Sequence, residues 1–313
     1  MRAATIRDGS IVVQEHPDPV PQAGELLIRV KAAGLNGADM MQLAGRYPAP
    51  PGAPADIPGL EFAGEVVDRG RAVGRFEPGD RVMAVVAGGG QAELAVVHES
   101  TVMPVPEELD WTVAGGVPEV FTTAHDALFT QAGLMVGERL LVHGAAGGVG
   151  MAAVQLGGMA GARVTATVRD ERARGQIGAL GVHAIAPDGF ADEGPFDVIL
   201  ELVGAPNLSE DLRALAMRGR LAVIGVGAGA RAEIDLRVLM AKRGSIHAST
   251  LRARSLEDKA LAARLVEKAV LPGFASGDLS VPVTAAFPLD DAAAAYERFK
   301  QGGKLGKIVL EMA

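Results

Sequence analysis

Residues 139–150 read RLLVHGAAGGVG, an apolar run that passes directly into a turn of glycine and alanine. A small-residue apolar segment, MAAVQLGGMA, follows it. This order predicts a buried strand, a tight turn and the start of a helix. A turn that brings backbone N–H groups against a diphosphate has no room for Cβ atoms and often needs positive φ. The first N–H groups of a helix lack intrahelical partners and favour an anion. The stretch therefore predicts the pyrophosphate site of a dinucleotide-binding fold.

The turn matches the fingerprint G-x-G-x-x-G with one departure, because alanine stands at the first position. Alone, such a match would also fit a helix-capping turn. A second predicted strand at residues 163–168 completes a βαβ unit of the usual length, about 30 residues, and favours nucleotide binding. The residues expected to hold the cofactor here are Ala145, Gly147, Gly148, Val149 and Gly150.

Length and composition suit a globular enzyme. The chain has 313 residues, and domains of about 100–200 residues make two domains the expectation. It is 49% hydrophobic and 22% charged. No apolar run reaches the roughly 18–20 residues of a membrane helix, and the start, MRAATIRDGS, lacks a secretory pattern. These features predict a cytoplasmic protein. The net charge of −8 without a long Lys/Arg run disfavours nucleic-acid binding.

Two patterns divide the chain. Short alternating strands separated by Gly, Pro and Asp fill the first third and predict a small barrel-like β domain. The proline-rich stretch at residues 45–59 cannot hold a helix or central strand, so it is predicted to be a surface loop. From about residue 120, helices alternate with apolar strands, as in a doubly wound parallel sheet. The last strand, residues 307–311, resembles the first third and is expected to return there.

Several stretches resemble the medium-chain dehydrogenase/reductase superfamily, most closely its zinc-free, zeta-crystallin-like branch of quinone oxidoreductases. They are AAGLNGADMMQLAGRYP, IPGLEFAGEVV, EPGDRV, HGAAGGVG and GKIVL, and they span nearly the whole chain in the right order. The resemblance implies an α/β protein with a GroES-like β-barrel domain and a Rossmann domain. We expect the GroES-like domain at residues 1–119 and 256–313, and the dinucleotide-binding Rossmann domain at residues 120–255.

The residue types disfavour zinc. Zinc-dependent relatives use Cys and His ligands, whereas this chain has no Cys and six scattered His without an HxxH or HxxxH pair. Glu61 matches a glutamate near the zinc of metal-dependent relatives, and we interpret it here as a structural hydrogen-bonding residue. The sequence therefore predicts no metal.

The second strand of the nucleotide domain indicates the cofactor. NAD-specific sites usually end this strand with Asp or Glu, whereas here it ends at Thr167 and Val168. Arg169 and Arg172 can bind a 2′-phosphate through charge-assisted hydrogen bonds. Asp170 and Glu171 argue the other way, and Asp170 at the strand tip would reverse the preference. We predict NADPH. Further cofactor contacts implied by the resemblance are Val203, Gly204, Gly225, Val226, Gly227, Thr250, Leu251 and residues 304–307, including Lys304 and Gly306.

The catalytic candidates are Asn36, Tyr47 and Thr123, which the resemblance places in the substrate cleft. Metal-free hydride transfer needs a positioned donor, excluded water and a group that meets negative charge on the substrate oxygen. Asn36 could instead form an Asn–Gly turn, and Tyr47 could simply fix the proline-rich loop. Asp39 is expected to cap a helix at residues 39–44 rather than act as a base.

The leading functional hypothesis is an NADPH:quinone reductase. An alternative is an NADPH-dependent reductase of activated C=C bonds, such as enals, enones or enoyl thioesters. A third hypothesis, of another class, is a non-catalytic cofactor-binding or RNA-binding protein. The acidic charge disfavours RNA binding, and the proline-rich loop with Tyr47 disfavours a protein without catalysis. We also expect a homodimer, because the predicted sixth strand at residues 245–249 would be an exposed sheet edge and relatives pair it across a two-fold axis.

Overall fold

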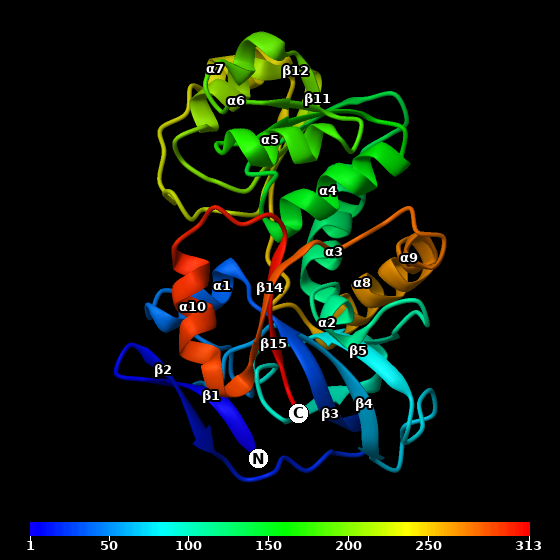
Figure 1. Cartoon of the computed structure of the whole chain (residues 1–313). Coiled ribbons are helices and arrows are strands. Elements are labelled where there is room, and N and C mark those ends of the chain that lie inside the picture. The colour runs from blue at the N-terminus through cyan, green and yellow to red at the C-terminus, as the bar shows by residue number, and fades with distance from the viewer. The chain divides into compact units, whose positions relative to one another are not determined.

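The computed structural model describes residues 1–313, which form two compact units (Figure 1). The first unit comprises Met1–Thr122 with Leu251–Ala313, and the second comprises Thr123–Thr250.

The second unit is built on a six-stranded parallel sheet with the strand order β10-β9-β8-β11-β12-β13. Its strands are β8 (Arg139–Val142), β9 (Arg163–Thr167), β10 (His183–Ile185), β11 (Phe196–Glu201), β12 (Leu215–Val223) and β13 (Ser245–Ala248). Its helices are α4 (Gly148–Met159), α5 (Glu171–Gly178), α6 (Leu208–Ala214) and α7 (Leu236–Lys242), with a π-helical turn at Asp126–Gln131 and a 3₁₀ turn at Phe190–Glu193. The predicted doubly wound sheet is confirmed.

The sequence explains why this sheet forms. Leu140, Leu141 and Val142 are all fully buried, as expected for a parallel strand covered by helices on both faces. Helices α4 and α5 pack on β8, β9 and β10, whereas α6 and α7 pack on β12. Parallel strands place all their carboxyl ends at one edge. That edge gathers His143 after β8, Thr167 at the end of β9 and Glu201 at the end of β11.

The first unit contains a seven-stranded sheet with the order β14-β15-β3-β4-β5-β7, in which β6 also pairs with β3, and a separate β1–β2 hairpin. Its strands are β1 (Arg2–Arg7), β2 (Ser10–Glu15), β3 (Glu25–Gly34), β4 (Glu61–Arg69), β5 (Arg81–Val85), β6 (Leu94–His98), β7 (Val102–Pro104), β14 (Val283–Pro288) and β15 (Lys307–Glu311). Its helices are α1 (Gly37–Leu43), α2 (Trp111–Ala114), α8 (Leu256–Ala269), α9 (Leu271–Ala275) and α10 (Ala292–Lys300), with α3 (Pro118–His125) crossing into the second unit. The predicted β domain is confirmed.

The C-terminal strand returns to the β domain, as predicted. Strand β15 pairs antiparallel with β3, with Leu310 opposite Ala33. Helix α10 packs on β14, β15 and β2 and lies beside β14 in Figure 1. Tyr296 on this helix is 1% exposed and contributes to the apolar core. The segment Leu251–Ala313 thus completes the first unit's core rather than forming a separate domain.

The helix predicted at residues 39–44 begins earlier, at Gly37, with Asn36 as the N-cap residue. Asp39 therefore lies in the first turn, where its Oδ2 accepts a hydrogen bond from the Asn36 N–H at 2.8 Å. This is the reciprocal half of a capping box. The expectation of a capping role was right, but the assigned N-cap position was wrong.

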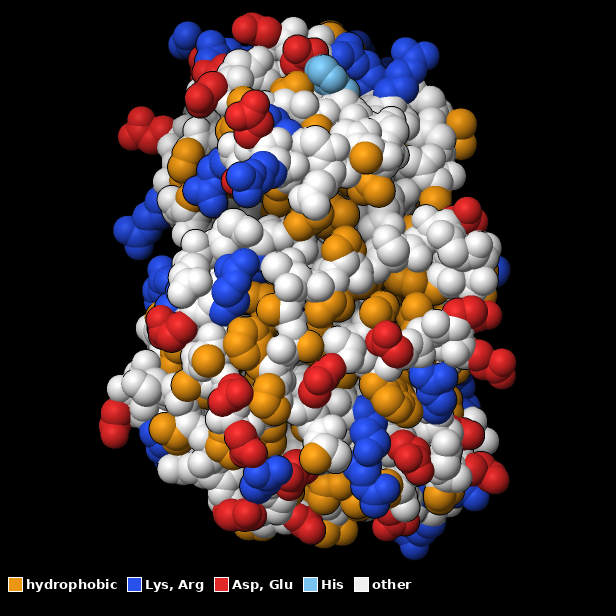
Figure 2. All heavy atoms as spheres, in the orientation of Figure 1, with side chains coloured by type: hydrophobic (Ala, Val, Ile, Leu, Met, Phe, Trp, Pro, Cys, Tyr) orange, Lys and Arg blue, Asp and Glu red, His pale blue; other side chains and the backbone are white.

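No helix in the chain is long and apolar enough to cross a membrane. The face shown in Figure 2 mixes Lys and Arg with Asp and Glu side chains. The basic side chains on this face therefore do not form one continuous patch.

Candidate functional site

The glycine turn of the second unit joins β8 to α4. Gly144 has a φ of +64°, a conformation that favours glycine. Ala145 follows with a fully buried side chain and no positive φ. Gly147 is the N-cap of α4, with φ −74° and ψ 165°. The residue that needs glycine at the start of the turn is therefore Gly144, one position before the alanine of the predicted fingerprint. Gly144 was not predicted as a site residue from the sequence, although it directly precedes Ala145 in the motif.

Gly150 shows why the helix begins so close to the turn. A Cβ atom there would lie 2.6 Å from the Ala145 Cα and 2.6 Å from the Gly144 carbonyl oxygen. Only glycine allows this approach, which leaves the first N–H groups of α4 at the edge of the sheet. Gly148 and Val149 lie in the first turn of α4 and are half-buried. The turn thus has the features of an anion cradle.

The end of β9 presents arginines rather than a carboxylate. The strand ends at Thr167, and Val168 is buried. Asp170 is the N-cap of α5, and its Oδ1 accepts a hydrogen bond from the Ala173 N–H at 2.9 Å. The Arg174 guanidinium donates to the Val168 carbonyl oxygen at 3.1 Å. Arg169 and Arg172 are exposed. Arg174 therefore contacts the backbone at the strand end, including the Arg169 carbonyl oxygen at 3.2 Å, although no site role was predicted for it from the sequence.

The turn after β11 is tightly packed. Gly204 has a φ of +115°, and a Cβ there would lie 2.5 Å from the Gly229 carbonyl oxygen. A Cβ on Gly225 would lie 2.3 Å from the Leu202 carbonyl oxygen. Gly227 has open space around it, and Val226 is 37% exposed. Gly204 and Gly225 thus allow the backbones after β11 and β12 to approach each other.

A buried glutamate holds this turn. Glu201 Oε1 accepts hydrogen bonds from the N–H groups of Val203 and Gly204, the latter at 2.8 Å. Its Oε2 accepts one from Asn207 Nδ2 at 2.9 Å. Next to it, His143 Nε2 lies 2.9 Å from Asp211 Oδ1. The backbone of the predicted cofactor contacts Val203 and Gly204 is therefore fixed from beneath by Glu201.

In the first unit, Asn36 belongs to a buried polar cluster. The Lys307 ammonium donates to Glu61 Oε1 at 2.5 Å and to Asn36 Oδ1 at 2.8 Å. Asn36 Nδ2 donates to Glu61 Oε1 at 2.9 Å. Glu61 Oε2 accepts from the Glu119 N–H at 2.8 Å. The interpretation of Glu61 as a hydrogen-bonding residue agrees with this geometry, and the Asn36 amide is engaged within the protein.

Lys307 was expected among the cofactor contacts of residues 304–307, but its side chain is 2% exposed and also donates to the Leu35 carbonyl oxygen at 2.9 Å. Its ammonium group is therefore committed to the buried cluster, and a cofactor contact within residues 304–307 stays a prediction. A Cβ on Gly34 would lie 2.3 Å from Glu61 Oε1, so glycine at position 34 makes room for the carboxylate.

Tyr47 and Arg252 meet at the proline-rich loop. The Arg252 guanidinium lies 5.0 Å from the centre of the Tyr47 ring and donates to the Tyr47 carbonyl oxygen at 2.9 Å. It also donates to Gln42 Oε1 at 2.6 Å and to the Ala87 carbonyl oxygen at 2.7 Å. Burial raises the pKa of the Tyr47 phenol, and the Arg252 charge opposes this shift. Arg252, which sequence reasoning missed, fixes the loop and leaves the phenol hydroxyl without a hydrogen-bond partner in the protein.

The remaining predicted residues lie at separate points of the two units. Thr123 is buried on α3, and Thr250 is exposed. Lys304 Nζ donates to the Gly306 carbonyl oxygen at 3.2 Å, and burial lowers the pKa of Lys304 to about 8. Gly306 has a φ of +78°, and a Cβ there would lie 2.2 Å from the Pro282 carbonyl oxygen.

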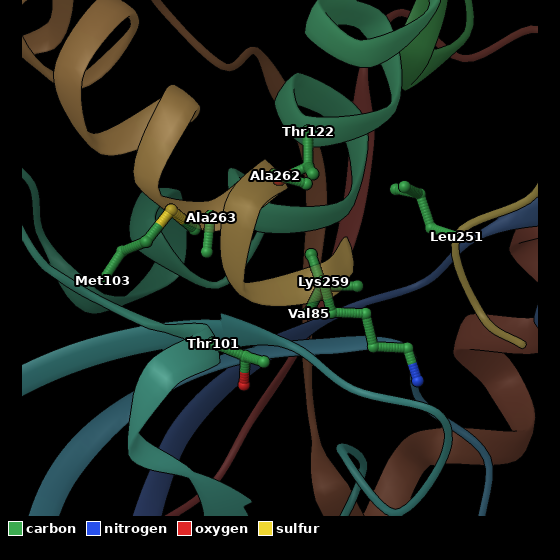
Figure 3. Close-up of a pocket in the computed structure, with 8 residues that line it drawn as sticks. All are labelled: Val85, Thr101, Met103, Thr122, Leu251, Lys259, Ala262 and Ala263. Atoms are coloured by element: carbon green, nitrogen blue, oxygen red, sulfur yellow. The ribbon is translucent and has the colours of Figure 1, made fainter. Parts of the chain in front are cut away.

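Leu251 lines a small open pocket in the first unit. In Figure 3 its side chain lies on the opposite side of α8 from Met103. The Thr122 hydroxyl, also in the lining, is buried without a hydrogen-bond partner. The lining residues are Val85, Thr101, Met103, Thr122, Leu251, Lys259, Ala262 and Ala263.

The donor groups do not fit a zinc site of the kind found in alcohol dehydrogenases. Cysteine is absent, and the Glu61 carboxylate is already bonded to Lys307, Asn36 and the Glu119 N–H. In the second unit, His143, Glu201 and Asp211 bring their ligand atoms within 4.8 Å of one another. Both His143 nitrogens there are hydrogen bonded, to Thr167 and Asp211. This grouping has no signal in the sequence, because its members are far apart along the chain.

Comparison with known proteins gives the family. Residues 22–107 match the alcohol dehydrogenase GroES-like domain, and residues 178–310 match the zinc-binding dehydrogenase family. The quinone oxidoreductase of Mus musculus is 34% identical over 307 residues, which cover 93% of this chain and 90% of that protein. The chain belongs to the quinone oxidoreductase family of medium-chain dehydrogenases/reductases.

Solved structures of this superfamily share the fold. A quinone oxidoreductase from Pseudomonas syringae pv. Tomato DC3000 superimposes with a TM-score of 0.88 at 26% identity, covering 99% of this chain and 100% of that one. The CurK enoyl reductase superimposes with a TM-score of 0.87 at 25% identity, covering 100% of this chain and 99% of that one. The fold class and the family expected from the sequence are thereby confirmed, and the chain is an oxidoreductase.

Proposed function

We propose that this oxidoreductase transfers a hydride from NADPH to a quinone without a metal ion or a flavin. The observation that carries the proposal is the glycine turn of Gly144, Gly147 and Gly150, in a chain similar over 93% of its length to a quinone oxidoreductase. Bound NADPH would supply the hydride from its nicotinamide. A cytoplasmic location stays a prediction.

The end of β9 supports NADPH over NADH. Asp170, the carboxylate that could bind a ribose diol, caps α5 and follows the strand end by three residues. Arg169, Arg172 and Arg174 would surround a 2′-phosphate there. We expect kcat/KM to be about tenfold or more higher with NADPH than with NADH. Arg172→Gln should lower it for NADPH and leave it unchanged for NADH, and equal values for the two cofactors in the wild type would contradict the preference.

Tyr47 is the proposed proton donor to the substrate oxygen. Its hydroxyl has no partner in the protein, and its raised pKa keeps it protonated at neutral pH. Arg252 holds the loop that presents it. We expect Tyr47→Phe to lower kcat/KM for quinones about tenfold, less than the 10² or more typical of an essential acid, because a quinone is already a good hydride acceptor. The Kd for NADPH should not change, and unchanged turnover would remove Tyr47 from the mechanism.

Thr123 and Asn36 remain proposed site residues with narrower roles. Thr123, on α3, is proposed to lie close to the nicotinamide. The Asn36 amide bonds to Lys307 and Glu61, so its proposed contribution is to shape the substrate side rather than to donate freely. Asn36→Asp would add a carboxylate beside Glu61, and we expect it to reduce quinone turnover more than NADPH binding.

A second candidate function is the reduction of activated C=C bonds. It is favoured by the similarity to the CurK enoyl reductase and by the unpartnered Tyr47 hydroxyl, since reduction of a C=C bond needs both a hydride and a proton. Initial rates of NADPH oxidation with ortho- and para-quinones, enals and enoyl-CoA thioesters distinguish the two. Tyr47→Phe should impair alkene reduction far more than quinone reduction.

Independence from zinc rests on the donor set, since Cys is absent and the Glu61 carboxylate is committed to Lys307. Elemental analysis of the active protein, purified without chelators, should find zinc well below one equivalent. One equivalent of zinc that tracks activity would overturn this part of the proposal.

A homodimer through β13 is also part of the proposal. This strand is the edge of the six-stranded sheet, and Ile246 on it is 37% exposed. Leu236 and Met240 on α7 are 59% and 74% exposed. An open edge beside exposed apolar side chains suits pairing with a second copy. Light scattering coupled to size-exclusion chromatography should give twice the mass of one chain. Ile246→Asp should shift the measured mass towards that of a single chain.

A further inference from the structure

A chain of buried polar side chains runs beneath the carboxyl ends of the second unit's sheet. Thr167 Oγ1 lies 3.0 Å from His143 Nδ1, and His143 Nε2 lies 2.9 Å from Asp211 Oδ1. Glu201 Oε2 lies 4.0 Å from the same Nε2. The three ionisable side chains are at most 1% exposed, and the Phe190 ring packs edge-on against the imidazole at 4.5 Å. The set is thus closed off from water.

The two ends of this chain hold the two turns that the proposed cofactor site depends on. Glu201 accepts the N–H groups of Val203 and Gly204. At the other end, the Thr167 carbonyl oxygen accepts the Ala145 N–H at 3.2 Å. A displacement within the set would therefore move the glycine turn and the Val203–Gly204 turn relative to each other.

The set contains two carboxyl groups and no cationic side chain. The groups facing its centre are His143 after β8, Thr167 from β9, Glu201 from β11, Asp211 and Asn207 around α6, and Phe190. Asp211 Oδ2 meets no hydrogen-bond donor. Two buried carboxylates without a cation are costly, so one proton is retained. Burial raises the pKa of both carboxyl groups, that of Asp211 to about 7, and lowers that of His143 to about 4, so the retained proton lies on the carboxyl pair rather than on the imidazole.

We propose that His143, Glu201 and Asp211 are positioning residues for the dinucleotide site, which hold its two turns in register while the set keeps one proton. This inference rests on the proposed dinucleotide binding. Loss of the proton puts a second negative charge beside Glu201, beneath the turns that would receive a diphosphate. Both the altered turn geometry and the added charge weaken binding of an anionic cofactor.

Asp211→Asn is the informative variant because it imitates the protonated state. An asparagine amide oxygen can still accept from His143, and its uncharged NH₂ group carries hydrogen at the Oδ2 position, as the protonated carboxyl group would. The matched control is Asp197→Asn, at the opposite end of β11, where the carboxylate accepts the Arg139 N–H at 2.9 Å. Both changes replace a carboxylate by an isosteric amide on the same sheet.

The test is the Kd of NADPH, and separately of NADH, from nicotinamide fluorescence between pH 6.5 and 8.5. We expect the wild-type Kd to rise about three- to tenfold over this range, as one added charge near a diphosphate would cause. Asp211→Asn should keep the low-pH affinity at every pH, whereas Asp197→Asn should follow the wild type.

The outcomes separate the two levels of the proposal. A wild-type protein that binds neither dinucleotide removes the site and the positioning role together. Binding with a Kd that is constant with pH in the wild type, or that rises equally in Asp211→Asn, overturns the positioning role and leaves dinucleotide binding intact. If Asp211→Asn does not fold, a flat wild-type profile is still sufficient to overturn it.

Discussion

Each unit buries a glutamate on its central sheet, but the two are neutralised differently. Glu61, at the start of β4, lies 2.5 Å from the Lys307 ammonium. Glu201, at the end of β11, meets backbone N–H groups and Asn207, and its ionisable neighbours are His143 and Asp211. A lysine supplies a fixed positive charge near neutral pH, whereas a carboxyl–imidazole set depends on a proton. The first cluster therefore holds a cation beside its glutamate, whereas the second holds no cationic side chain and keeps a proton instead.

The largest effect is expected from breaking the fixed pair. Lys307→Met leaves the fully buried Glu61 carboxylate without its cation. Removing one partner of a buried ion pair costs about 3–5 kcal/mol. Urea unfolding at pH 7, followed by circular dichroism, should show a loss of this size in the free energy of unfolding.

The double variant Lys307→Met with Glu61→Gln tests the cause. It removes the uncompensated charge, so it should recover part of the lost stability, even though Glu61→Gln alone breaks the pair. A double variant whose loss equals the sum of the two single losses would show that packing, not the charge pair, holds this cluster together.

A smaller loss is expected in the second cluster. Glu201→Ala leaves the N–H groups of Val203 and Gly204 and the Asn207 amide without their acceptor. Buried donors left unsatisfied cost about 1–3 kcal/mol. The matched comparison is Asp170→Ala, which removes one exposed helix cap and should cost about 1 kcal/mol. If Asp170→Ala is the more damaging of the two in urea unfolding, Glu201 does not support the turn.

The sequence predicted the parts of the fold that depend on local patterns. Strand β15 was expected at residues 307–311, where the structure has it, and β13 at residues 245–249, one residue past its observed end at Ala248. Apolar runs bounded by glycine identify such strands directly. The position of the glycine turn was also predicted. Its first residue with a conformation that favours glycine was not. Gly144 was missed because the fingerprint was aligned on Ala145, and sequence spacing does not reveal which residue has a positive φ.

The polar clusters could not be predicted because they depend on contacts distant in sequence. Lys307 and Glu61 are 246 positions apart, and His143 and Asp211 are 68 apart. The motif around Lys307 suggested a cofactor contact, whereas the β3–β15 pairing brings it beneath Asn36. Likewise, Arg252 reaches Tyr47 across 205 positions. Single residues of this kind have no periodic signal, so only the assembled sheet shows their partners.

The smallest predicted effect is a difference between the two clusters in how their contribution to stability changes with pH. Burial raises the pKa of Asp211 from 3.8 to about 7, so its contribution to stability is full below the unfolded value and is lost as the pH rises through 7. His143 acts oppositely, because its pKa is lowered from 6.5 to about 4 and its contribution grows over that interval. Burial raises the pKa of Asp39 to about 6, so most of its contribution to stability is already lost at pH 6.5.

Between pH 6.5 and 7.5 the Asp211 contribution therefore dominates among these groups, and the free energy of unfolding should fall by about 0.5 kcal/mol in the wild type. Asp211→Asn should flatten this slope, whereas Asp39→Asn should retain it, because Asp39 titrates mainly at lower pH. Urea midpoints at the two pH values measure the difference. A slope that survives in Asp211→Asn but disappears in Asp39→Asn would place the pH-dependent group in the first unit, and would reverse the contrast between the two buried clusters.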